Sequence, residues 1–344
     1  MKSGDMLVSW RLGPLASWRF PGYEQVMDDS GHIPVLGEAV MGLLAPRAGQ
    51  VYVDCTVGRG GHAAMIGSRL APGGRVVAMD ADPANVAYTR ERLVSLAVPV
   101  EVVHSSFVAA EAVCERAGLA LPGADLLLAD LGFASNQVDD AGRGLSFLRD
   151  GPLDMRLNPE GGTTAADLVN GLPESELADV LWRYGEERLS RKIARKIGGE
   201  RQVRPILTTT HLAELVRAAY GRGLGHRGRP ERTRGRQSAG RGGGSRIDPA
   251  TRTFMALRIA VNGELEALEH LLMSLPRLVR PGGVAAIISF HSLEDRLVKQ
   301  AFRALAGDAG WTLLTRKPVE ADEPEIARNP RSRSAKLRAV RRGE

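Results

Sequence analysis

Three aspartates each close a short apolar run, and they are the side chains in this sequence best suited to bind or polarise a ligand. The runs are Val51–Asp54, Arg75–Asp80 and Ala124–Asp130. Their length and composition predict buried parallel strands. Parallel strands end at one edge of an open α/β sheet, where such folds bind ligands, so Asp54, Asp80 and Asp130 are expected at one site. A role as helix N-cap accounts for any one of these aspartates. It accounts less well for three of them, each at the end of a strand.

A glycine-rich loop follows the first predicted strand. It reads Gly58-Arg-Gly-Gly-His-Ala63 and fits the dinucleotide-binding pattern G-x-G-x-x-G/A. The next segment, Ala63–Leu70, has helix-forming composition. Strand, turn and helix N-terminus would together let bare backbone approach a ligand closely. The loop alone fits a nicotinamide dinucleotide and an adenosyl ligand equally.

The positions of the aspartates separate these two ligands. Asp54, before the loop, can accept a hydrogen bond from a ligand's amino group, which nicotinamide binding does not require. Asp80 can hold both hydroxyls of a ribose and therefore fits either ligand. Asp130 would face the reactive end of the ligand, where methyl transfer to an exocyclic amine needs an acceptor. We therefore favour a methyltransferase over a nicotinamide-dependent enzyme.

Strand and helix signals alternate along the chain as far as Asp130. The remaining elements of this region are the helical segments Pro83–Leu96 and Val108–Ala117 and the strand Val100–His104. The alternation predicts a doubly wound, mostly parallel α/β sheet with helices on both faces.

A mainly helical region then interrupts the alternation. Its candidate helices are Glu174–Arg183, Glu186–Ile197 and Thr210–Ala219, and beyond it Ala250–Leu272 predicts one long helix and Val284–Ser289 another strand. The expected organisation is a flexible N-terminal extension (1–29), a first part of the α/β domain (30–140), an inserted helical domain (141–248) and a second part (249–344).

The basic charge is concentrated in two segments. Gly221–Arg246 has eight Arg and one Glu, and Arg328–Arg342 has six Arg, one Lys and no acid, whereas the net charge of all 344 residues is +6. A polyanion-binding protein distributes charge in this way. A solubilising tract explains the Gly/Arg-rich segment about as well.

The composition argues against several other classes of protein. No apolar run approaches the roughly 20 residues that a membrane span needs, and the first 29 residues lack the apolar core of a secretory signal. The two cysteines, Cys55 and Cys114, provide neither a disulfide framework nor metal-ligand spacing. We expect a cytoplasmic protein that binds no metal.

Several further blocks of sequence carry a specific resemblance. The most distinctive are Asp150-Gly-Pro-Leu-Asp-Met-Arg156 and Ser289-Phe-His-Ser-Leu-Glu-Asp-Arg296, and others are His32-Ile-Pro-Val-Leu36, Asp130-Leu-Gly-Phe-Ala-Ser-Asn-Gln137, Tyr184-Gly-Glu-Glu-Arg188, Ala250–Asn262 and Asn329–Ser334. Together with the glycine loop, and taken in their order along the chain, they resemble the bacterial methyltransferases that modify N4 of a decoding-centre cytosine in small-subunit ribosomal RNA.

The resemblance implies a class I, Rossmann-like methyltransferase fold, S-adenosylmethionine as methyl donor and 16S rRNA within the small ribosomal subunit as partner. The donor-binding residues that it implies are Gly60, Gly61, His62, Asp80, Phe107, Asp130 and Gln137. It makes 141–248 the expected substrate-recognition domain. This sequence has Ala134-Ser-Asn-Gln137 where the family commonly has Ser-Ser-Pro-Gln, and its Gly/Arg tract, 221–246, exceeds the usual linker.

Residue chemistry assigns the catalytic role to Asp130. The exocyclic amine of cytosine is a weak nucleophile, because its lone pair is delocalised into the ring, and it must lose a proton as it attacks. Acceptors on its N–H groups favour that change, and we expect Asp130 and the backbone carbonyls of 131–134 to supply them. Methylation at C5 would instead need a cysteine nucleophile, and neither cysteine lies at the end of the fourth predicted strand.

Two other functions fit parts of this pattern. One is amino-methyl transfer to another nucleic acid such as DNA, and the other is an RNA-binding assembly factor whose fold is catalytically silent. In the favoured interpretation the target base must leave its stack. The inserted domain and the basic C-terminal run are therefore expected to hold the surrounding phosphates.

Overall fold

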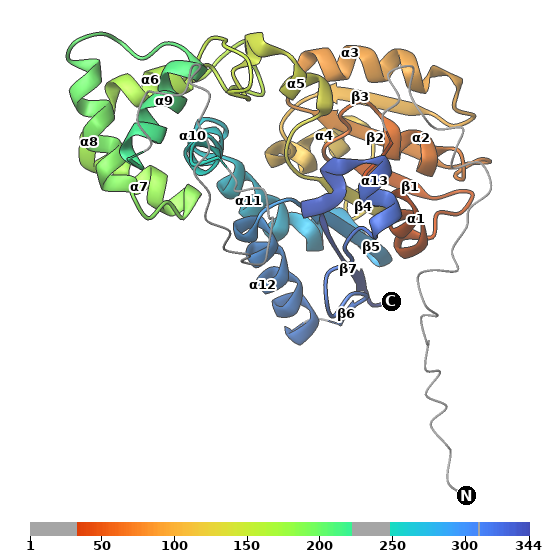
Figure 1. Cartoon of the computed structure of the whole chain (residues 1–344). Helices are drawn as coiled ribbons and strands as arrows, with labels where there is room; N and C mark the ends of the chain where they lie inside the picture. The colour runs from red at the N-terminus through yellow and green to blue at the C-terminus, as the bar shows by residue number, and fades with distance from the viewer. Residues whose placement is uncertain (1–32, 222–247, 309) are drawn as a thin grey trace, which may run out of the picture. The chain divides into compact units, whose positions relative to one another are not determined.

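The computed structural model of the chain describes residues 33–221, 248–308 and 310–344 (Figure 1). The predicted extension, 1–29, and all of the Gly/Arg tract except Gly221 lie outside these residues. The chain divides into two compact units, one formed by Met1–Gly132 with Glu269–Glu344 and the other by Phe133–Leu268. The second unit contains the predicted insertion, 141–248, and extends beyond it at both ends.

A seven-stranded sheet with the order β3-β2-β1-β4-β5-β7-β6 organises the first unit. Its strands are β1 (Val51–Asp54), β2 (Arg75–Asp80), β3 (Val100–His104), β4 (Ala124–Asp130), β5 (Val279–Ser289), β6 (Trp311–Leu313) and β7 (Lys336–Arg342). The strands from β3 to β5 are parallel, and β7 is antiparallel to both of its neighbours. This arrangement confirms the predicted α/β fold with a mostly parallel sheet.

The register of the strands brings the three aspartates to one edge of the sheet. Asp54 lies opposite Ala78 of β2 and Leu128 of β4, each two residues before the terminal aspartate of its strand. The strand order reverses between β1 and β4, which is where open α/β sheets bind ligands. The sequence therefore placed Asp54, Asp80 and Asp130 correctly along the strands.

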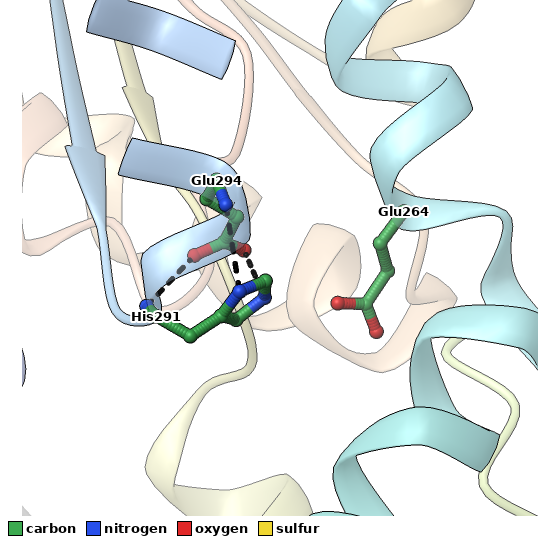
Figure 2. A group of neighbouring side chains, drawn as sticks. All are labelled: Glu264, His291 and Glu294. Atoms are coloured by element: carbon green, nitrogen blue, oxygen red, sulfur yellow. Dashed lines mark hydrogen bonds and ion pairs between the residues drawn. The ribbon is translucent and has the colours of Figure 1, made fainter. Parts of the chain in front are cut away.

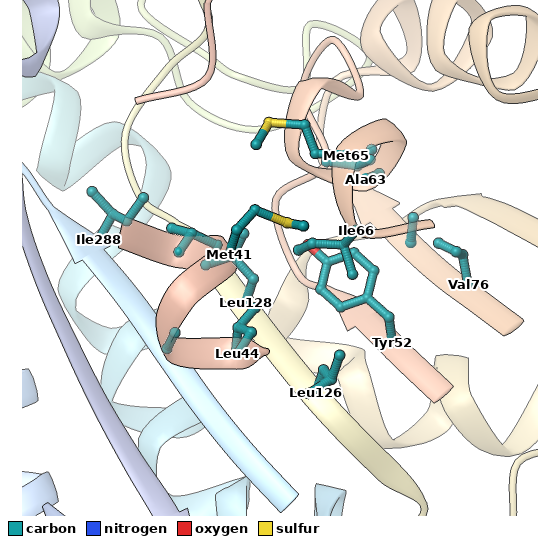
Figure 3. Close-up of a cluster of buried hydrophobic side chains, with 14 of the residues drawn as sticks. Met41, Leu44, Tyr52, Ala63, Met65, Ile66, Val76, Leu126, Leu128 and Ile288 are labelled. Atoms are coloured by element: carbon teal, nitrogen blue, oxygen red, sulfur yellow. The ribbon is translucent and has the colours of Figure 1, made fainter. Parts of the chain in front are cut away.

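Helices pack on the sheet and bury an apolar core. They are α1 (Gly37–Leu44), α2 (Gly61–Gly67), α3 (Pro83–Arg92), α4 (Ala110–Arg116), α12 (Ser292–Asp308) and α13 (Glu323–Arg328), with 3-10 turns η3 (Leu93–Ser95), η4 (Phe107–Ala109) and η6 (Pro330–Ser334). Figure 3 shows Met41 of α1 and Ile66 of α2 beside Tyr52, Leu126 and Leu128 of the strands. This core fixes the ends of β1 and β4 relative to the loop between β1 and α2.

The second unit is helical and has its own core. Its elements are α5 (Ser135–Asp139), η5 (Ala141–Arg143), α6 (Ala165–Gly171), α7 (Glu174–Gly185), α8 (Ser190–Arg201), α9 (Thr209–Ala219), α10 (Ala250–Asn262) and the start of α11 (Glu264–Leu278). Leu181, Ile193, Leu212 and Phe254 are among its buried side chains. Among the described helices of either unit, none has the length and apolar character of a membrane span.

Two predicted helix boundaries are wrong because single residues leave the helical conformation. The segment expected as one helix, 250–272, is divided by Gly263, which ends α10 with φ 58°. In the same way Glu186, with φ 47°, ends α7, so α8 begins at Ser190 instead of Glu186. The apolar spacing continues through both breaks, and periodicity alone therefore did not reveal them.

The expectation that the whole basic C-terminal run holds phosphates is wrong for Arg338 and Arg342, whose side chains are bound within the fold. Lys336–Arg342 forms β7 inside the sheet, and Arg338 is only 6% exposed. Its guanidinium donates to both carboxylate oxygens of Asp295, at 2.7 and 3.2 Å. Arg342 donates to backbone carbonyls of the first unit. These cations stabilise the fold, because a buried charge must be paired.

Candidate functional site

The glycine loop, Gly58–His62, leaves the end of β1 and turns into α2. Gly58 and Gly60 have φ angles of 51° and 74°, a left-handed conformation that residues with a Cβ rarely adopt. The N–H of Gly58 donates to Asp80 at 2.8 Å, and its carbonyl accepts from the hydroxyl of Thr89 at 2.7 Å. The loop is therefore held in one shape by β2 and α3.

Packing inside the protein also requires two of these glycines. A Cβ on Gly60 would lie 3.0 Å from the methyl group of Thr89, and one on Gly61 would lie 2.8 Å from Cγ of the Pro34 ring. Such distances are too short for carbon atoms, so a side chain at either position must displace a neighbour. The glycines thus serve contacts within the protein as well as the close approach to a ligand that the sequence predicted.

Asp80 has a structural task beyond the ribose contact predicted for it. Besides Gly58, its carboxylate accepts from the N–H of Asp82 at 2.8 Å and from the amide of Asn85 at 3.3 Å. Burial raises the pKa of Asp80, and the backbone donors lower it. A carboxylate has about four acceptor positions, so three are used within the protein and one stays open.

Asp54 is buried and hydrogen-bonded within the protein. It is 1% exposed, and it accepts from the hydroxyl of Tyr52 at 2.7 Å and from the N–H of Thr56 at 3.1 Å. The Thr56 hydroxyl in turn accepts from the N–H of Asp130 at 2.6 Å. Burial raises the pKa of Asp54 to about 6, although the Tyr52 hydroxyl and the nearby His62 lower it. Asp54 thus faces the interior, and it supports the end of β4 through Thr56.

Tyr52 and Thr56 were not singled out from the sequence. A signal for Tyr52 exists, since a buried tyrosine hydroxyl needs a partner and residues i and i+2 of a strand share a face. Asp54 stands two residues after it. Thr56 lies in the loop after the strand, and no spacing rule connects its hydroxyl to a residue 74 positions away.

His62 and Asp130 lie side by side at the carboxyl edge of the sheet. Nε2 of His62 is 3.6 Å from Oδ2 of Asp130, and their side chains are 9% and 25% exposed. Both ring nitrogens of His62 and Oδ1 of Asp130 are buried and have no hydrogen-bond partner within the described part of the chain. Because buried polar atoms in proteins are almost always paired, these three atoms make this edge the candidate site for a polar ligand.

The remaining predicted residues lie in different units. Half-buried Phe107 begins η4, shortly after the end of β3, and belongs to the same sheet edge as Asp80. Gln137 lies in α5 of the second unit, is 3% exposed, and accepts from the N–H of Ala134 at 2.7 Å. Six of the seven residues predicted to bind the methyl donor therefore lie in the first unit.

Both cysteines are buried and free. Burial raises the pKa of Cys55 well above its usual value and that of Cys114 to about 11. A thiol must ionise to act as a nucleophile, so neither residue is suited to attack a pyrimidine ring. This finding agrees with the argument against methylation at C5.

His291 has a local partner, as Figure 2 shows. Its Nε2 lies 3.2 Å from Oε1 of Glu294, whose Oε2 accepts from the N–H groups of Phe290 and His291 at 2.8 and 3.3 Å. Glu294 lies in the first turn of α12 and reaches back to the residues before the helix. These contacts at the start of α12 account for the position of the histidine.

Comparison with known proteins agrees with this geometry. The model of the MraW methylase family matches residues 29–343. The chain belongs to the MraW methylase family.

Two relatives of this MraW family member share the same name. The ribosomal RNA small subunit methyltransferase H of Sorangium cellulosum is 48% identical, over 90% of each chain. The protein of the same name from Koribacter versatilis is 45% identical, over 94% of this chain and 97% of its own. A solved SAM-dependent methyltransferase from Aquifex aeolicus is 12% identical, with a TM-score of 0.36 over 93% of this chain and 95% of its own.

Proposed function

We propose that this MraW family member transfers a methyl group from S-adenosylmethionine to N4 of a decoding-centre cytosine in 16S rRNA of the small ribosomal subunit, in the cytoplasm. The observation that carries the proposal is the position of Asp130 and His62 beside the glycine loop, at the edge where the strand order reverses. The relatives named above are methyltransferases of small-subunit rRNA by name, which supports the same substrate.

The residues at this edge fit the methyl donor. The donor carries its methyl group on a positively charged sulfur. After transfer of the methyl group, the sulfur is part of a neutral thioether. Asp130 provides a negative charge suited to that centre, and Gly60 and Gly61 admit close backbone approach. The open acceptor position of Asp80 suits a ribose hydroxyl, and Phe107 provides an apolar face for adenine. His62 of the first unit and, from the second unit, Gln137 are the other residues that we propose for the donor.

Asp130 would accept a hydrogen bond from the amine that attacks the methyl group. Its Oδ1 has no partner among the described residues, and its backbone is fixed by Thr56. An acceptor that is already in place stabilises the positive charge that develops on the nitrogen and needs no rearrangement during the reaction. Holding amine and methyl group in line would contribute much of the remaining rate.

A direct assay tests the proposal. The protein is incubated with tritium-labelled donor and, in parallel, 30S subunits, free 16S rRNA and DNA, and the product is digested to nucleosides. We expect label as N4-methylcytidine from the ribosomal substrate. Label in C5-methylcytidine, or in DNA alone, would contradict the proposal. Donor binding without any transfer would favour the silent assembly factor.

A row of exposed cations on α8 supports substrate recognition by the second unit. Arg191, Lys192, Arg195 and Lys196 are exposed, whereas Ile193, Ala194 and Ile197 between them are buried. This spacing gives the helix one apolar face in the core and one basic face toward solvent. Four cations within two turns match the phosphate spacing of a nucleic acid backbone better than they match a small ligand.

Replacing all four cations of α8 by glutamine is expected to weaken binding of 16S rRNA and to flatten its salt dependence. Each lost phosphate contact lowers the slope of log affinity against log salt by roughly 0.7 to 0.9, so four contacts change it by about 3. Filter binding between 50 and 300 mM salt measures the slope. Arg47→Gln, an exposed cation before β1, is the control. An unchanged slope in the α8 variant would contradict this role.

A further inference from the structure

His62 lies at the start of α2, beside the carboxylate of Asp130. Its Nε2 is 3.6 Å from Asp130, and Asp54 interacts electrostatically with both His62 and Asp130. The imidazole is nine-tenths buried, and neither nitrogen has a hydrogen-bond partner among the described residues. A buried histidine that served only packing would donate one ring N–H to a fixed acceptor. The unpaired ring therefore points to a role in proton transfer.

Two carboxylates can stabilise a proton that this histidine receives during the reaction. Burial raises the pKa of Asp54 to about 6, and the nearby His62 lowers it, which reflects attraction between the two side chains when both are charged. Burial also raises the pKa of Tyr52 and of Cys55, which both interact with Asp54. Asp54 and Asp130 are thus two acidic groups that would attract an imidazolium formed at His62.

We propose that His62 is the catalytic group that receives the proton lost by the acceptor amine, and that Asp54 is a positioning residue that stabilises the resulting imidazolium. The proposal rests on the methyl transfer proposed above. Contact between His62 and Asp130 supplies the route, because a small torsional change turns the 3.6 Å separation into a hydrogen bond. Catalytic hydrogen bonds are often this long before the substrate binds.

The step balances in charge and in atoms. The nitrogen–methyl bond forms with the lone pair of the amine, and the sulfur–methyl bond breaks and leaves its electron pair on sulfur. One N–H bond then breaks, its electron pair stays on nitrogen, and the proton passes over the carboxylate of Asp130 to Nε2 of His62. The positive charge that sulfur loses reappears on the imidazole, so the total charge facing Asp54 and Asp130 is unchanged.

Chemical rescue tests the role of His62. In single turnovers at saturating donor, His62→Ala is expected to methylate about 100-fold more slowly, the usual effect of losing a general base. Added imidazole should restore part of the rate, and substituted imidazoles should do so in the order of their basicity. The acid limb of the pH profile should disappear without imidazole. His270→Ala, which removes an exposed histidine of α11, should change neither the rate nor its response to imidazole.

The second variant tests the positioning role. Asp54→Asn keeps the size of the side chain and removes its charge, so we expect about a tenfold lower rate and an acid limb displaced to lower pH. Donor affinity, measured by calorimetry with S-adenosylhomocysteine, should stay within a few-fold. An unmoved acid limb would overturn this part of the proposal.

Two results would overturn the role of His62. One is a raised KM for the donor with unchanged kcat in His62→Ala, which would make the residue a binding group only. The other is a slow variant that no imidazole accelerates. If the wild-type protein itself methylates none of the nucleic acids, the proposed function fails, and that outcome is visible before any variant is compared. If it methylates another nucleic acid, the same comparison is made on that substrate.

Discussion

Replacing Asp130 by asparagine should slow methyl transfer about 10³-fold and change donor affinity far less. The substitution keeps the shape of the side chain, but it replaces one carboxylate oxygen by an NH₂ group that cannot accept from the attacking amine. Removing one prearranged electrostatic partner of a transition state costs about 10² to 10³ in rate. The same change removes the route by which the proton reaches His62. We therefore expect the loss of rate to lie at the upper end of this range. Single-turnover transfer to 30S subunits at saturating donor measures it.

A matched control lies on the same strand. Asp125 is also buried, but it lies near the opposite end of β4, where it accepts from the N–H of Val51 at 2.8 Å and pairs with Arg280. Asp125→Asn should reduce stability and leave the rate of the folded protein unchanged. If Asp130→Asn bound the donor normally and methylated at the wild-type rate, Asp130 would not be the acceptor.

The second large effect concerns stability. Asp295→Ala should reduce the free energy of unfolding of the first unit by about 3 to 5 kcal/mol, because it leaves the Arg338 guanidinium buried without its partner. Arg338 is 6% exposed, and both of its contacts to Asp295 lie within the fold. Urea unfolding measures the loss, with hydrogen exchange of the β7 amides to assign it to the first unit.

Two further variants show whether the lost stability comes from burial. Glu174 pairs with Arg195 at 3.7 Å on the surface, where the two side chains are 48% and 78% exposed. Glu174→Ala should cost less than about 1 kcal/mol, as exposed pairs do. The double variant Asp295→Leu with Arg338→Met should recover much of the loss, since apolar residues of similar volume can replace a buried pair. A loss below 1 kcal/mol in Asp295→Ala would contradict the assigned role.

Much of the fold of the first unit could be predicted because the sequence patterns that indicate its strands are local. The bounds of β1 to β4 agree with the predicted strands, since short apolar runs closed by an acid or a turn are distinctive in a parallel sheet. The helix breaks at Glu186 and Gly263 were not predicted, because each depends on one residue in a left-handed conformation within continuing apolar spacing. The place of Lys336–Arg342 in the sheet was hidden by its charge, because the carboxylate that pairs with the buried Arg338 belongs to Asp295, 43 positions earlier in the chain.

The residue types of the candidate site could be predicted from the sequence, but the roles of the individual residues could be predicted less well. Asp80 and Asp130 were placed correctly at the strand ends. The number of hydrogen bonds that Asp80 accepts within the protein depends on loop contacts, which no spacing rule predicts. Asp54 was expected to meet a ligand and instead meets Tyr52. The pairing of His62 with Asp130 joins residues 68 positions apart, so only the fold brings it to light.

The place of β7 has a consequence for how the sheet can open. This strand, Lys336–Arg342, lies between β5 and β6 although β6 precedes it in the chain. When β7 detaches, β5 is left with an open edge and β6 loses its only partner in the described sheet. An open strand edge pairs readily with another chain, so local opening of β7 alone is enough to expose this protein to aggregation.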